Sequence, residues 1–525
     1  PYFKCLNIPD ERAAAFTALG MSKATGEAVV LICTSGSAVL NYYPAVAEAF
    51  YQNIPLIVLS ADRPPEWIDQ ADGQTIRQDG ALRQHTVFDV SLRSEPEDPD
   101  TVQHNNFLIN KALETALNLN RGPVHLNVPF REPLYGTQEN DQENEVRNIS
   151  YTVPQKSLSP ETLEELQQIW DASEKIMVPA GMQDTDAVLT EQLNELGKSR
   201  ALVFTETLSN IPGEALFPCI DRLINTTHEE ELQHLQPDLL ITTGKAVVSK
   251  MVKKMLRKFE IKAHWHIDDS DFMLDTYRHL TRHIPVKPRA FFDAVDYGVS
   301  SKEYPQLWRK AEAATRRAHA DFISRTQWCD LKLFAALSDT VEEGIVHLAN
   351  SSPVRYAQLF NWKTGIEFFG NRGTSGIDGS ISTAAGHAMR TNKPVWAVTG
   401  DVSFLYDSNA LFHNHLPDNL RIIVINNGGG NIFRILPGPR TTKALEEHFE
   451  SNHNFNAKGI AQNFWVNYLE AHDEAQFNEH LKELAQPDYQ GPVILEVFTP
   501  RLENDAVLKK YFKHLYHAKN NRDEL

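Results

Sequence analysis

The stretch from Gly400 to Phe433 is the feature that most constrains how this 525-residue chain can fold. An apolar run from Val395 reaches a Gly-Asp pair, and a second apolar run, Leu420 to Asn426, meets a turn with three consecutive glycines. Short apolar runs that end in turn residues are typical of buried strands in a parallel sheet. Ligands of such sheets bind outside the carboxyl ends of the strands. The pattern therefore predicts an α/β fold with a ligand site at this edge.

A carboxylate and an amide stand at the ends of these two predicted strands. Asp401 follows the first strand, and Asn427 follows the second, 26 positions after it. Neighbouring strand ends bring such side chains together, and glycines let backbone groups approach the same ligand. Mg²⁺ prefers one or two side-chain oxygens, a carbonyl and phosphate oxygens around it. Either half alone also fits an ordinary turn or loop, but the pair together indicates a site for magnesium and phosphate.

Length, composition and charge exclude several classes of protein. The chain is longer than one hydrophobic core supports, so we expect two to four domains. Its 42% hydrophobic and 23% charged residues are typical of an ordinary globular protein. We expect a cytoplasmic protein, because no apolar run could cross a bilayer and the first residues lack a signal-peptide pattern. The formal net charge of −18 argues against nucleic-acid or membrane binding. The four cysteines have no zinc-site or disulfide spacing.

Three successive units alternate short apolar strands with helical patterns, which is typical of doubly wound α/β domains. We expect these units over residues 1–136, 155–300 and 306–525, with a helical region from Gln306 to Leu348 opening the third. The polar stretch Thr137 to Ser150 shows neither periodicity and predicts a linker. The strands expected in the first two units are Ala28 to Cys33, Leu56 to Ser60, Val124 to Val128, Lys175 to Ala180, Ala201 to Thr205, Asp238 to Thr243 and Ala263 to Ile267; the helices expected in the first are Glu11 to Ala24 and Val39 to Tyr51.

The Gly-Asp pair and the Asn-Asn-Gly-Gly-Gly turn, at this spacing, resemble the diphosphate-binding signature of thiamine-diphosphate enzymes. In that family the Asp carboxylate, the second Asn and a carbonyl two residues later hold Mg²⁺, for which Mn²⁺ can substitute. The resemblance gives these roles to Asp401, Asn427 and Gly429. One departure is visible, because the signature usually begins Gly-Asp-Gly and this chain has Val402 in the third position.

The Asp10-Glu11-Arg12 element opens a predicted helix, and an acidic pair at this place can simply cap it. In thiamine-diphosphate enzymes a Glu in this context contacts the pyrimidine ring and drives the imino tautomer that deprotonates the thiazolium carbon. That role needs a carboxyl group in an apolar pocket with a tuned pKa. The resemblance assigns it to Glu11, and the helix cap stays as the alternative.

Further motifs are similar to one branch of the family. They are Arg63-Pro64-Pro65-Glu66, Gln74-Thr75-Ile76-Arg77-Gln78, the run from Asn371 to Gly386, and Gly400-Asp401-Val402-Ser403-Phe404. Together they resemble the 2-succinyl-5-enolpyruvyl-6-hydroxy-3-cyclohexene-1-carboxylate synthases of menaquinone biosynthesis, over both outer units. That branch decarboxylates 2-oxoglutarate on thiamine diphosphate and adds the resulting succinyl carbanion equivalent to isochorismate. The resemblance therefore implies a carboligase with two carboxylate-bearing substrates.

The resemblance also implies residues for each ligand. Arginine suits these substrates, because its planar fork pairs with carboxylates and stays charged. The substrate contacts are expected at Arg63, Gln74, Lys250, Ser351, Arg355 and Arg372, with Ile432 and Phe433 as apolar walls. The cofactor contacts are expected at Glu11, Ser35, Gly36, Ile377, Gly400, Asp401, Val402, Ser403, Asn427, Gly429 and Ile432. Neighbouring lysines also make Lys250 part of a possible solvated helix face, and Ile377 is equally a core residue.

In this family the cofactor lies between the first unit of one subunit and the third of another, so the resemblance implies a homodimer or a higher oligomer. A strand and a loop with a Ser-Arg pair precede the Asp-Glu-Arg element in the family, whereas this chain begins at Pro1. We therefore expect a first unit that is truncated at its N-terminus.

Two alternative functions stay open. One is a different carboligase of the acetolactate synthase type, against which the number of basic residues at substrate positions argues. The other is a non-catalytic homologue, against which intact Glu11, Asp401 and Asn427 argue.

Overall fold

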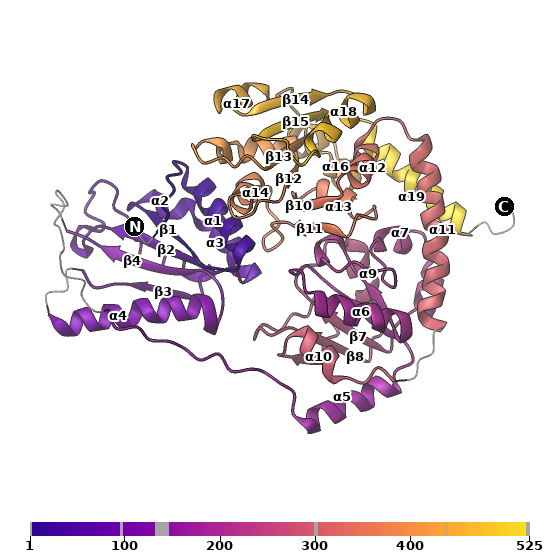
Figure 1. The fold of residues 1–525 in the computed structure, drawn as a ribbon, viewed down its shortest axis with the longest axis horizontal. Coiled ribbons are helices and arrows are strands. Elements are labelled where there is room, and N and C mark those ends of the chain that lie inside the picture. The colour runs from indigo at the N-terminus through magenta and orange to yellow at the C-terminus, as the bar shows by residue number, and fades with distance from the viewer. Residues whose placement is uncertain (1–2, 95–97, 132–145, 299–302, 437, 521–525) are drawn as a thin grey trace.

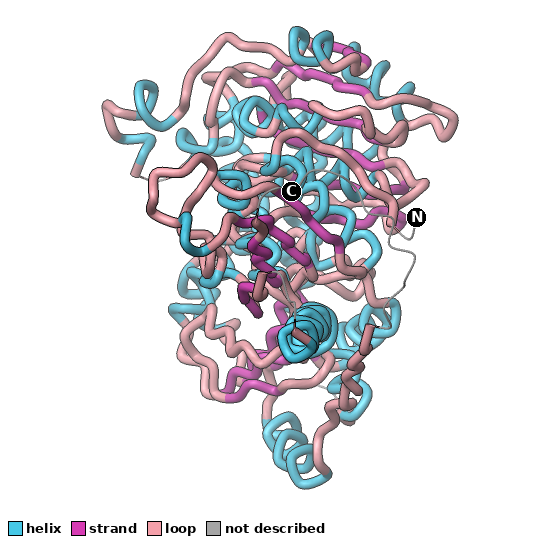
Figure 2. Tube along the Cα trace, turned by 90° about the vertical axis from the view of Figure 1, so that its left-hand side faces the viewer, coloured by secondary structure: helices cyan, strands magenta, loops and turns pink. Residues whose placement is uncertain are grey.

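The computed structural model describes residues 3–94, 98–131, 146–298, 303–436 and 438–520, which form three α/β domains (Figure 1). Each domain contains one parallel sheet. From the first domain to the third, the order of the strands across the sheet is β1-β2-β4-β3, β6-β5-β7-β8-β9 and β11-β10-β12-β13-β15-β14. Figure 2 shows helices on either side of the strands. The predicted fold class, three α/β domains with parallel sheets, is confirmed.

The first domain was predicted in outline. Its strands are β1 (Val29–Cys33), β2 (Leu56–Asp62), β3 (Phe88–Ser91) and β4 (Val124–Pro129), and its helices are α1 (Glu11–Thr25), α2 (Ser37–Asn41), α3 (Tyr43–Gln52) and α4 (Pro99–Glu114). One helix was expected from Val39 to Tyr51, which is wrong. The chain forms two helices there, because Pro44 lies in the first turn of α3 and has no N–H to continue α2.

The middle domain has strands that are buried on both faces, as a parallel sheet covered by helices requires. Its strands are β5 (Ile176–Pro179), β6 (Ala201–Phe204), β7 (Leu239–Thr243), β8 (Ala263–Ile267) and β9 (Arg282–Ile284). Its helices are α5 (Pro160–Ala172), α6 (Ala187–Ser199), α7 (Ile220–Ile224), α8 (Glu229–His234), α9 (Lys250–Lys258) and α10 (Pro288–Ala294). The four strands expected here are present.

The third domain has strands β10 (Glu343–Leu348), β11 (Gly365–Phe369), β12 (Val395–Gly400), β13 (Leu420–Asn426), β14 (Asn467–Ala471) and β15 (Val493–Phe498). Its helices are α11 (Glu303–Arg325), α12 (Asp330–Thr340), α13 (Pro353–Ala357), α14 (Ser380–Ala388), α15 (Asp401–Tyr406), α16 (Ile432–Ile435), α17 (Lys458–Asn463), α18 (Glu474–Leu484) and α19 (Asn504–Asn520). The helical region predicted to reach Leu348 is wrong at its end, because Glu343 to Leu348 pair with both β11 and β12 as a buried strand.

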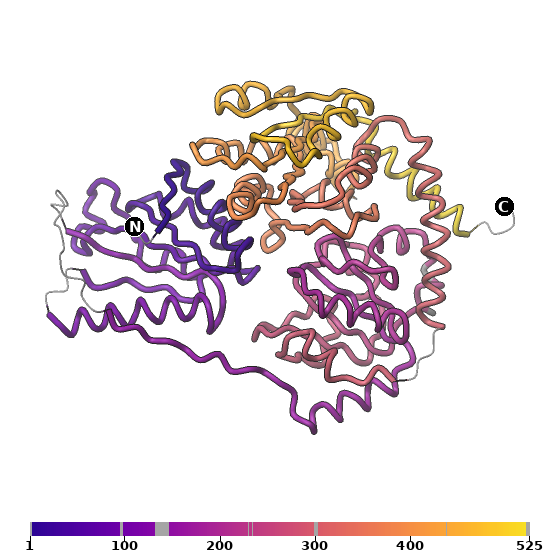
Figure 3. The backbone as a smooth tube through the Cα atoms, viewed as in Figure 1, coloured from indigo at the N-terminus to yellow at the C-terminus, as the bar shows by residue number. Residues whose placement is uncertain are grey.

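Two segments run between the domains. Figure 3 shows the chain crossing from the first domain to α5 in an extended path. Most of the expected linker, Thr137 to Ser150, lies outside the described residues; residues 146–150 contain no helix or strand.

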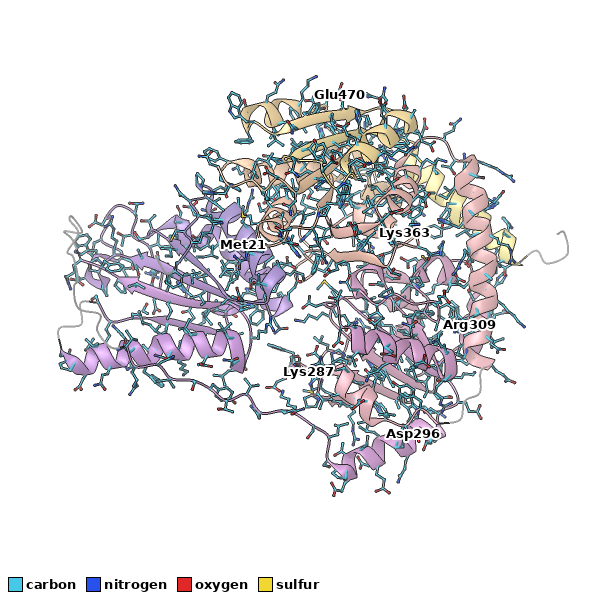
Figure 4. All side chains as sticks on the ribbon, in the orientation of Figure 1. Met21, Lys287, Asp296, Arg309, Lys363 and Glu470 are labelled. Atoms are coloured by element: carbon cyan, nitrogen blue, oxygen red, sulfur yellow. The ribbon has the colours of Figure 1, made fainter. Side chains whose placement is uncertain are left out.

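Figure 4 labels Arg309 on α11, whose guanidinium donates to the carbonyl oxygens of Gly197 and Ala215 in the middle domain at 2.9 and 3.3 Å. Helix α11 therefore fastens the middle domain to the third.

None of the helices in the described ranges combines the length and apolar character that a membrane crossing needs. The four cysteines are free thiols; Cys5 is exposed and the other three are buried.

The first and third domains meet where α1 packs on α14. A Cβ atom on Gly20 would overlap the carbonyl oxygen of Thr383, and one on Gly386 would overlap the carbonyl oxygen of Thr17. The two glycines therefore let the two backbones touch, reciprocally, across the domain boundary.

We expect Gly386→Ala to destabilise the protein although alanine is the better helix former. The added methyl group must push α1 away from α14, and overpacking of this kind costs about 1–3 kcal/mol. Thermal and urea unfolding measure the effect. The matched control is Gly459→Ala in α17, where a Cβ would meet nothing within 4 Å; equal melting temperatures for the two variants would contradict the packing argument.

Candidate active site

Asp401 and Asn427 lie next to each other at the carboxyl edge of the third sheet. Strands β12 and β13 are parallel neighbours, so the residues that follow them emerge together. Both side chains are buried, at 4% and 7% exposure. Asp401 accepts hydrogen bonds from the backbone N–H of Val402 at 2.7 Å and of Gly429 at 2.9 Å. The second bond draws the glycine turn against the carboxylate.

The turn after β13 adopts a conformation that requires glycine. Gly428 and Gly429 have φ values of 75° and 145°, which side-chain-bearing residues rarely adopt. A Cβ on Gly429 would also lie 2.6 Å from the carbonyl oxygen of Glu450. Gly430 donates its N–H to the same oxygen at 2.5 Å. The glycines thus shape a backbone cradle beside Asp401, with half-buried Phe433 packed against Gly430.

The donor set at this edge fits Mg²⁺. It offers a carboxylate, a side-chain amide and a backbone carbonyl, all oxygen donors, which hard cations prefer. Within the described ranges no three His, Cys, Asp or Glu side chains gather where they could hold a metal ion. A cation here would therefore depend on the amide and carbonyl oxygens and on phosphate oxygens from a ligand. The roles expected for Asp401, Asn427 and Gly429 stay predictions.

Two neighbours of this edge did not emerge from the sequence. Nε2 of His453 lies 3.4 Å from an oxygen of Asp401, and this carboxylate raises the pKa of the imidazole. Asp330, which is 1% exposed, accepts a hydrogen bond from the amide of Asn427 at 3.1 Å. Both stand in segments without a recognisable motif, so only the folded chain brings them here.

The loop before α14 joins the same edge. Ser403, at 4% exposure, donates its hydroxyl to the carbonyl oxygen of Ile377 at 2.7 Å. Ile377 itself is half-buried, and Ile432 is buried at 7% exposure. Half burial leaves part of the Ile377 side chain accessible, as a residue that props a cofactor would need.

Two arginines, Arg355 on α13 and Arg372 in the loop after β11, lie close together beyond this edge. Arg372 donates to Asn350 at 2.6 Å, and Asn350 in turn donates to the carbonyl oxygen of Gly376 at 2.6 Å. Burial, and after it the nearby charge of Arg355, lowers the pKa of Arg372. Ser351, with φ of 75°, makes the turn between Asn350 and the helix that carries Arg355. Four of the predicted residues therefore share one region: Ser351, Arg355, Arg372 and Ile377.

Acidic groups of the middle domain face these arginines. Glu206 accepts hydrogen bonds from the N–H groups of Val248 and Ser249 at 2.6 and 2.7 Å, and burial raises its pKa to about 7. Burial also raises the pKa of Asp221, while Arg355 acts in the opposite direction. Burial lowers the pKa of Arg355, and the charges of both carboxylates act in the opposite direction with a smaller effect. The arginine pair thus lies at the border between the middle and third domains.

Helix α9 carries both the predicted Lys250 and Lys253, which interacts with the arginine pair. Lys250, the predicted substrate contact, is the exposed first residue of the helix. Lys253, one turn later, is the lysine whose pKa burial lowers and whose charge interacts with Glu206, Arg372 and Arg355. The family motif pointed to Lys250, whereas the approach of Lys253 to these charges depends on the folded chain.

In the first domain the structure separates the roles of Asp10 and Glu11. Asp10 is the N-cap of α1, and its carboxylate accepts from the N–H of Ala13 at 2.9 Å. The cap is therefore supplied without Glu11. Glu11 lies near the end of β1, where its charge adds to the larger effect of burial in raising the pKa of Cys33 to about 12.

The other predicted first-domain residues stand at the carboxyl ends of β1 and β2. Ser35 is buried, and Gly36 has φ of 86° and donates its N–H to Gln78 at 3.1 Å. A Cβ on Gly36 would lie 3.3 Å from the Cα of Gln74, which is exposed. Arg63 directly follows β2. These residues form a second group at the edge of a different sheet from Asp401.

The two groups are connected within one chain through the start of α1. Arg12 donates to the carbonyl oxygen of Tyr406 at 2.6 Å, and Asn409 donates to Asp10 at 2.7 Å. The start of α1 therefore docks on the end of α15 and on the turn that follows it, rather than on Asp401 at the beginning of α15.

Comparison with known families matches three successive parts of the chain. The family models for the thiamine pyrophosphate enzymes match in order: the N-terminal TPP binding domain at residues 2–82, the middle domain at 155–346 and the C-terminal TPP binding domain at 351–497. The first match contains β1 and β2, the second contains β5 to β9, and the third contains β11 to β14 and most of β15.

Several curated proteins that resemble the chain over nearly its full length are named 2-succinyl-5-enolpyruvyl-6-hydroxy-3-cyclohexene-1-carboxylate synthase. The protein of Flavobacterium johnsoniae is 42% identical over 98% of this chain and 92% of its own length. The protein of Christiangramia forsetii is 40% identical over 97% and 91%, and that of Bacteroides fragilis is 35% identical over 98% and 92%.

Proposed function

Because this chain belongs to the 2-succinyl-5-enolpyruvyl-6-hydroxy-3-cyclohexene-1-carboxylate synthase family of thiamine pyrophosphate enzymes, we propose that it decarboxylates 2-oxoglutarate and joins the succinyl unit to isochorismate in menaquinone biosynthesis. The observation that carries this proposal is identity of 35–42% to such synthases over nearly the full chain. The structure also supports this proposal, because Asp401, Asn427 and the glycine turn lie together at one edge of the third sheet.

The third domain would hold the diphosphate end of the cofactor, and Mg²⁺ is the metal that we propose there. Asp401, the amide oxygen of Asn427 and the carbonyl of Gly429 would provide the protein ligands. When bound, thiamine diphosphate supplies a thiazolium carbon that adds to the 2-oxo group and accepts the electrons released with carbon dioxide. The half-buried Ile377 would contact the ring system and hold its bend.

Glu11 would act on the other end of the cofactor. Its carboxyl group would hydrogen-bond a ring nitrogen of the pyrimidine and exchange a proton with it, which favours the imino tautomer. Two observations support this assignment: the helix is already capped by Asp10, and Glu11 lies beside the end of β1 near buried Cys33. Ser35 and Gly36 follow that same strand and would border the ring.

The arginine pair would bind substrate carboxylates. A bidentate guanidinium-carboxylate pair is strong where water is excluded, and burial lowers the pKa of both Arg355 and Arg372. An incoming carboxylate would also relieve the repulsion between the two cations. Arg63 and Gln74 of the first domain would provide further contacts, with Ile432 and Phe433 as walls. Lys250 stays a proposal, and its exposure gives it less support than the arginines have.

We propose a homodimer as the smallest active form, in the cytoplasm. The residues around Glu11 and those around Asp401 stand at the edges of different sheets. Within one chain, Asp10 and Arg12 at the start of α1 contact Asn409 and Tyr406, which lie after the start of α15. The first domain of one subunit would therefore complete the third domain of another.

The function is tested by incubating the protein with 2-oxoglutarate, isochorismate, thiamine diphosphate and Mg²⁺ and looking for the adduct by mass spectrometry. We expect the adduct only when all four are present. Pyruvate in place of 2-oxoglutarate serves as the control for an acetolactate synthase-like activity. An equal or better product yield with pyruvate alone would contradict the proposal, and no product from either acid would favour a non-catalytic homologue.

We expect Arg372→Ala to lower kcat/KM for the substrates strongly while the affinity for thiamine diphosphate changes little. Removing one partner of a buried charge pair costs about 2–5 kcal/mol. Steady-state kinetics and cofactor titration measure the two effects. Arg390→Ala is the matched control, because Arg390 lies on the same domain but is exposed. Kinetics for Arg372→Ala that equal those of Arg390→Ala would reject the substrate role.

A further inference from the structure

Asp330 is a buried carboxylate that the proposed function leaves without a role. It is the first residue of α12, 71 positions before Asp401, and only 1% of it is exposed. Its two oxygens accept from different partners: one from the amide nitrogen of Asn427 at 3.1 Å, the other from the hydroxyl of Thr499 at 2.6 Å. Its own N–H donates to Asn504 at 2.9 Å. Its orientation is thus fixed from both sides.

The contact with Asn427 decides which end of that amide faces the metal position. A side-chain amide has an oxygen that accepts and a nitrogen that donates, and the two ends are interchangeable by a half-turn. An acceptor placed beside the amide binds its nitrogen, which turns the oxygen away from Asp330. A cation needs that oxygen, because an NH₂ group has no lone pair to offer it.

The alternative is that Asp330 only stabilises the start of α12. A helix N-terminus favours a carboxylate, and Thr499 would satisfy one oxygen without any contribution from Asn427. This role would not require the amide contact, in which the nitrogen of Asn427 lies 3.1 Å from the second oxygen of Asp330.

Resting on the proposed magnesium site, we propose that Asp330 is a positioning residue: it accepts from Nδ2 of Asn427 and thereby aims Oδ1 of Asn427 at Mg²⁺. Outer partners of this kind fix the orientation of the groups that touch a metal, and their loss lowers metal affinity about 10–100-fold.

The test measures metal binding directly, with Mn²⁺ as the probe and thiamine diphosphate present, by electron paramagnetic resonance of the free ion. We expect Asp330→Asn to weaken Mn²⁺ binding about 10–100-fold, because an amide at 330 pairs with either end of Asn427. Thr499→Val should have little effect, since it leaves the contact between Asp330 and Asn427 in place. Asp89→Asn is the control for burial, because it removes a carboxylate that is 3% exposed from the first domain.

A swap separates positioning from simple stabilisation. In Asp330→Asn combined with Asn427→Asp, the new amide donates to the new carboxylate, whose second oxygen again faces the cation. We expect Asn427→Asp to tighten Mn²⁺ binding more in the Asp330→Asn background than in the wild type. A role confined to the helix start would give the same gain in both backgrounds, because the new carboxylate adds its charge in either one. If Asp330→Asn melts below the assay temperature, the swap is compared with the wild type instead, and recovery to within tenfold is the expected result.

Two outcomes would overturn the inference, and they are distinguishable. Wild-type Mn²⁺ affinity in Asp330→Asn, with weakened affinity in Asp401→Ala, would reject the positioning role and keep the magnesium site. Unchanged affinity in Asp401→Ala as well would reject the site and the positioning role together.

Discussion

Glu11→Gln and Asp401→Ala will each be inactive as homodimers, and a mixture of the two will regain about a quarter of wild-type activity. Glutamine keeps the shape of Glu11 but cannot exchange the proton, and the loss of such a group costs about 10²–10⁴-fold in rate. Each homodimer lacks one of the two groups at both sites. A heterodimer places both substitutions at one site and leaves the other intact.

The expected fraction follows from two-fold symmetry. Random subunit exchange gives heterodimers in roughly half of the population, and one of the two sites in each is intact. Native mass spectrometry confirms the exchange, and the adduct assay measures the activity. A mixture of Glu11→Gln with wild type controls for exchange itself. If exchange is complete and the mixed variants stay inactive, both residues serve the site of one chain, or Glu11 has no catalytic role.

Asp401→Ala will abolish the dependence of thiamine-diphosphate binding on Mg²⁺. Asp401 is the one carboxylate proposed for the metal, while the diphosphate brings further negative charge that needs a cation beside it. The substitution also removes the acceptor that holds the N–H of Gly429 at 2.9 Å, so the glycine turn loses its anchor. Both effects act on the same site and in the same direction.

Titration calorimetry of the apoprotein with thiamine diphosphate, with and without Mg²⁺, measures this effect. The wild type should bind far more tightly with the metal, and Asp401→Ala should bind weakly under both conditions. Asp418→Ala is the matched control, because Asp418 is an exposed carboxylate between the same two strands. A wild-type response to Mg²⁺ in Asp401→Ala would remove Asp401 from the metal site.

The elements that were predicted correctly are those whose signal is local. Strand β13 was predicted with its observed limits. Its seven consecutive residues are buried and form an apolar run with turn residues at both ends. Strand β3 was not foreseen, because it lies at the edge of its sheet and all four of its residues are only half-buried. Strand β10 was taken for the end of a helix, because it follows α12 after only two residues. Its pairing with β11 and β12 overrides what the preceding helical pattern suggested.

For the site, the sequence determined the motif residues and the chemistry they can perform. A φ of 145° requires a glycine, and a cation requires a carboxylate at the strand end. Both residues lie in one short segment of the sequence. Tertiary structure decided the rest: Lys253 approaches the arginines, and His453 and Asp330 border Asp401 and Asn427. These contacts join residues tens to hundreds of positions apart. They depend on which strand ends and helix starts the packed sheets bring together, and no local pattern in the chain encodes that.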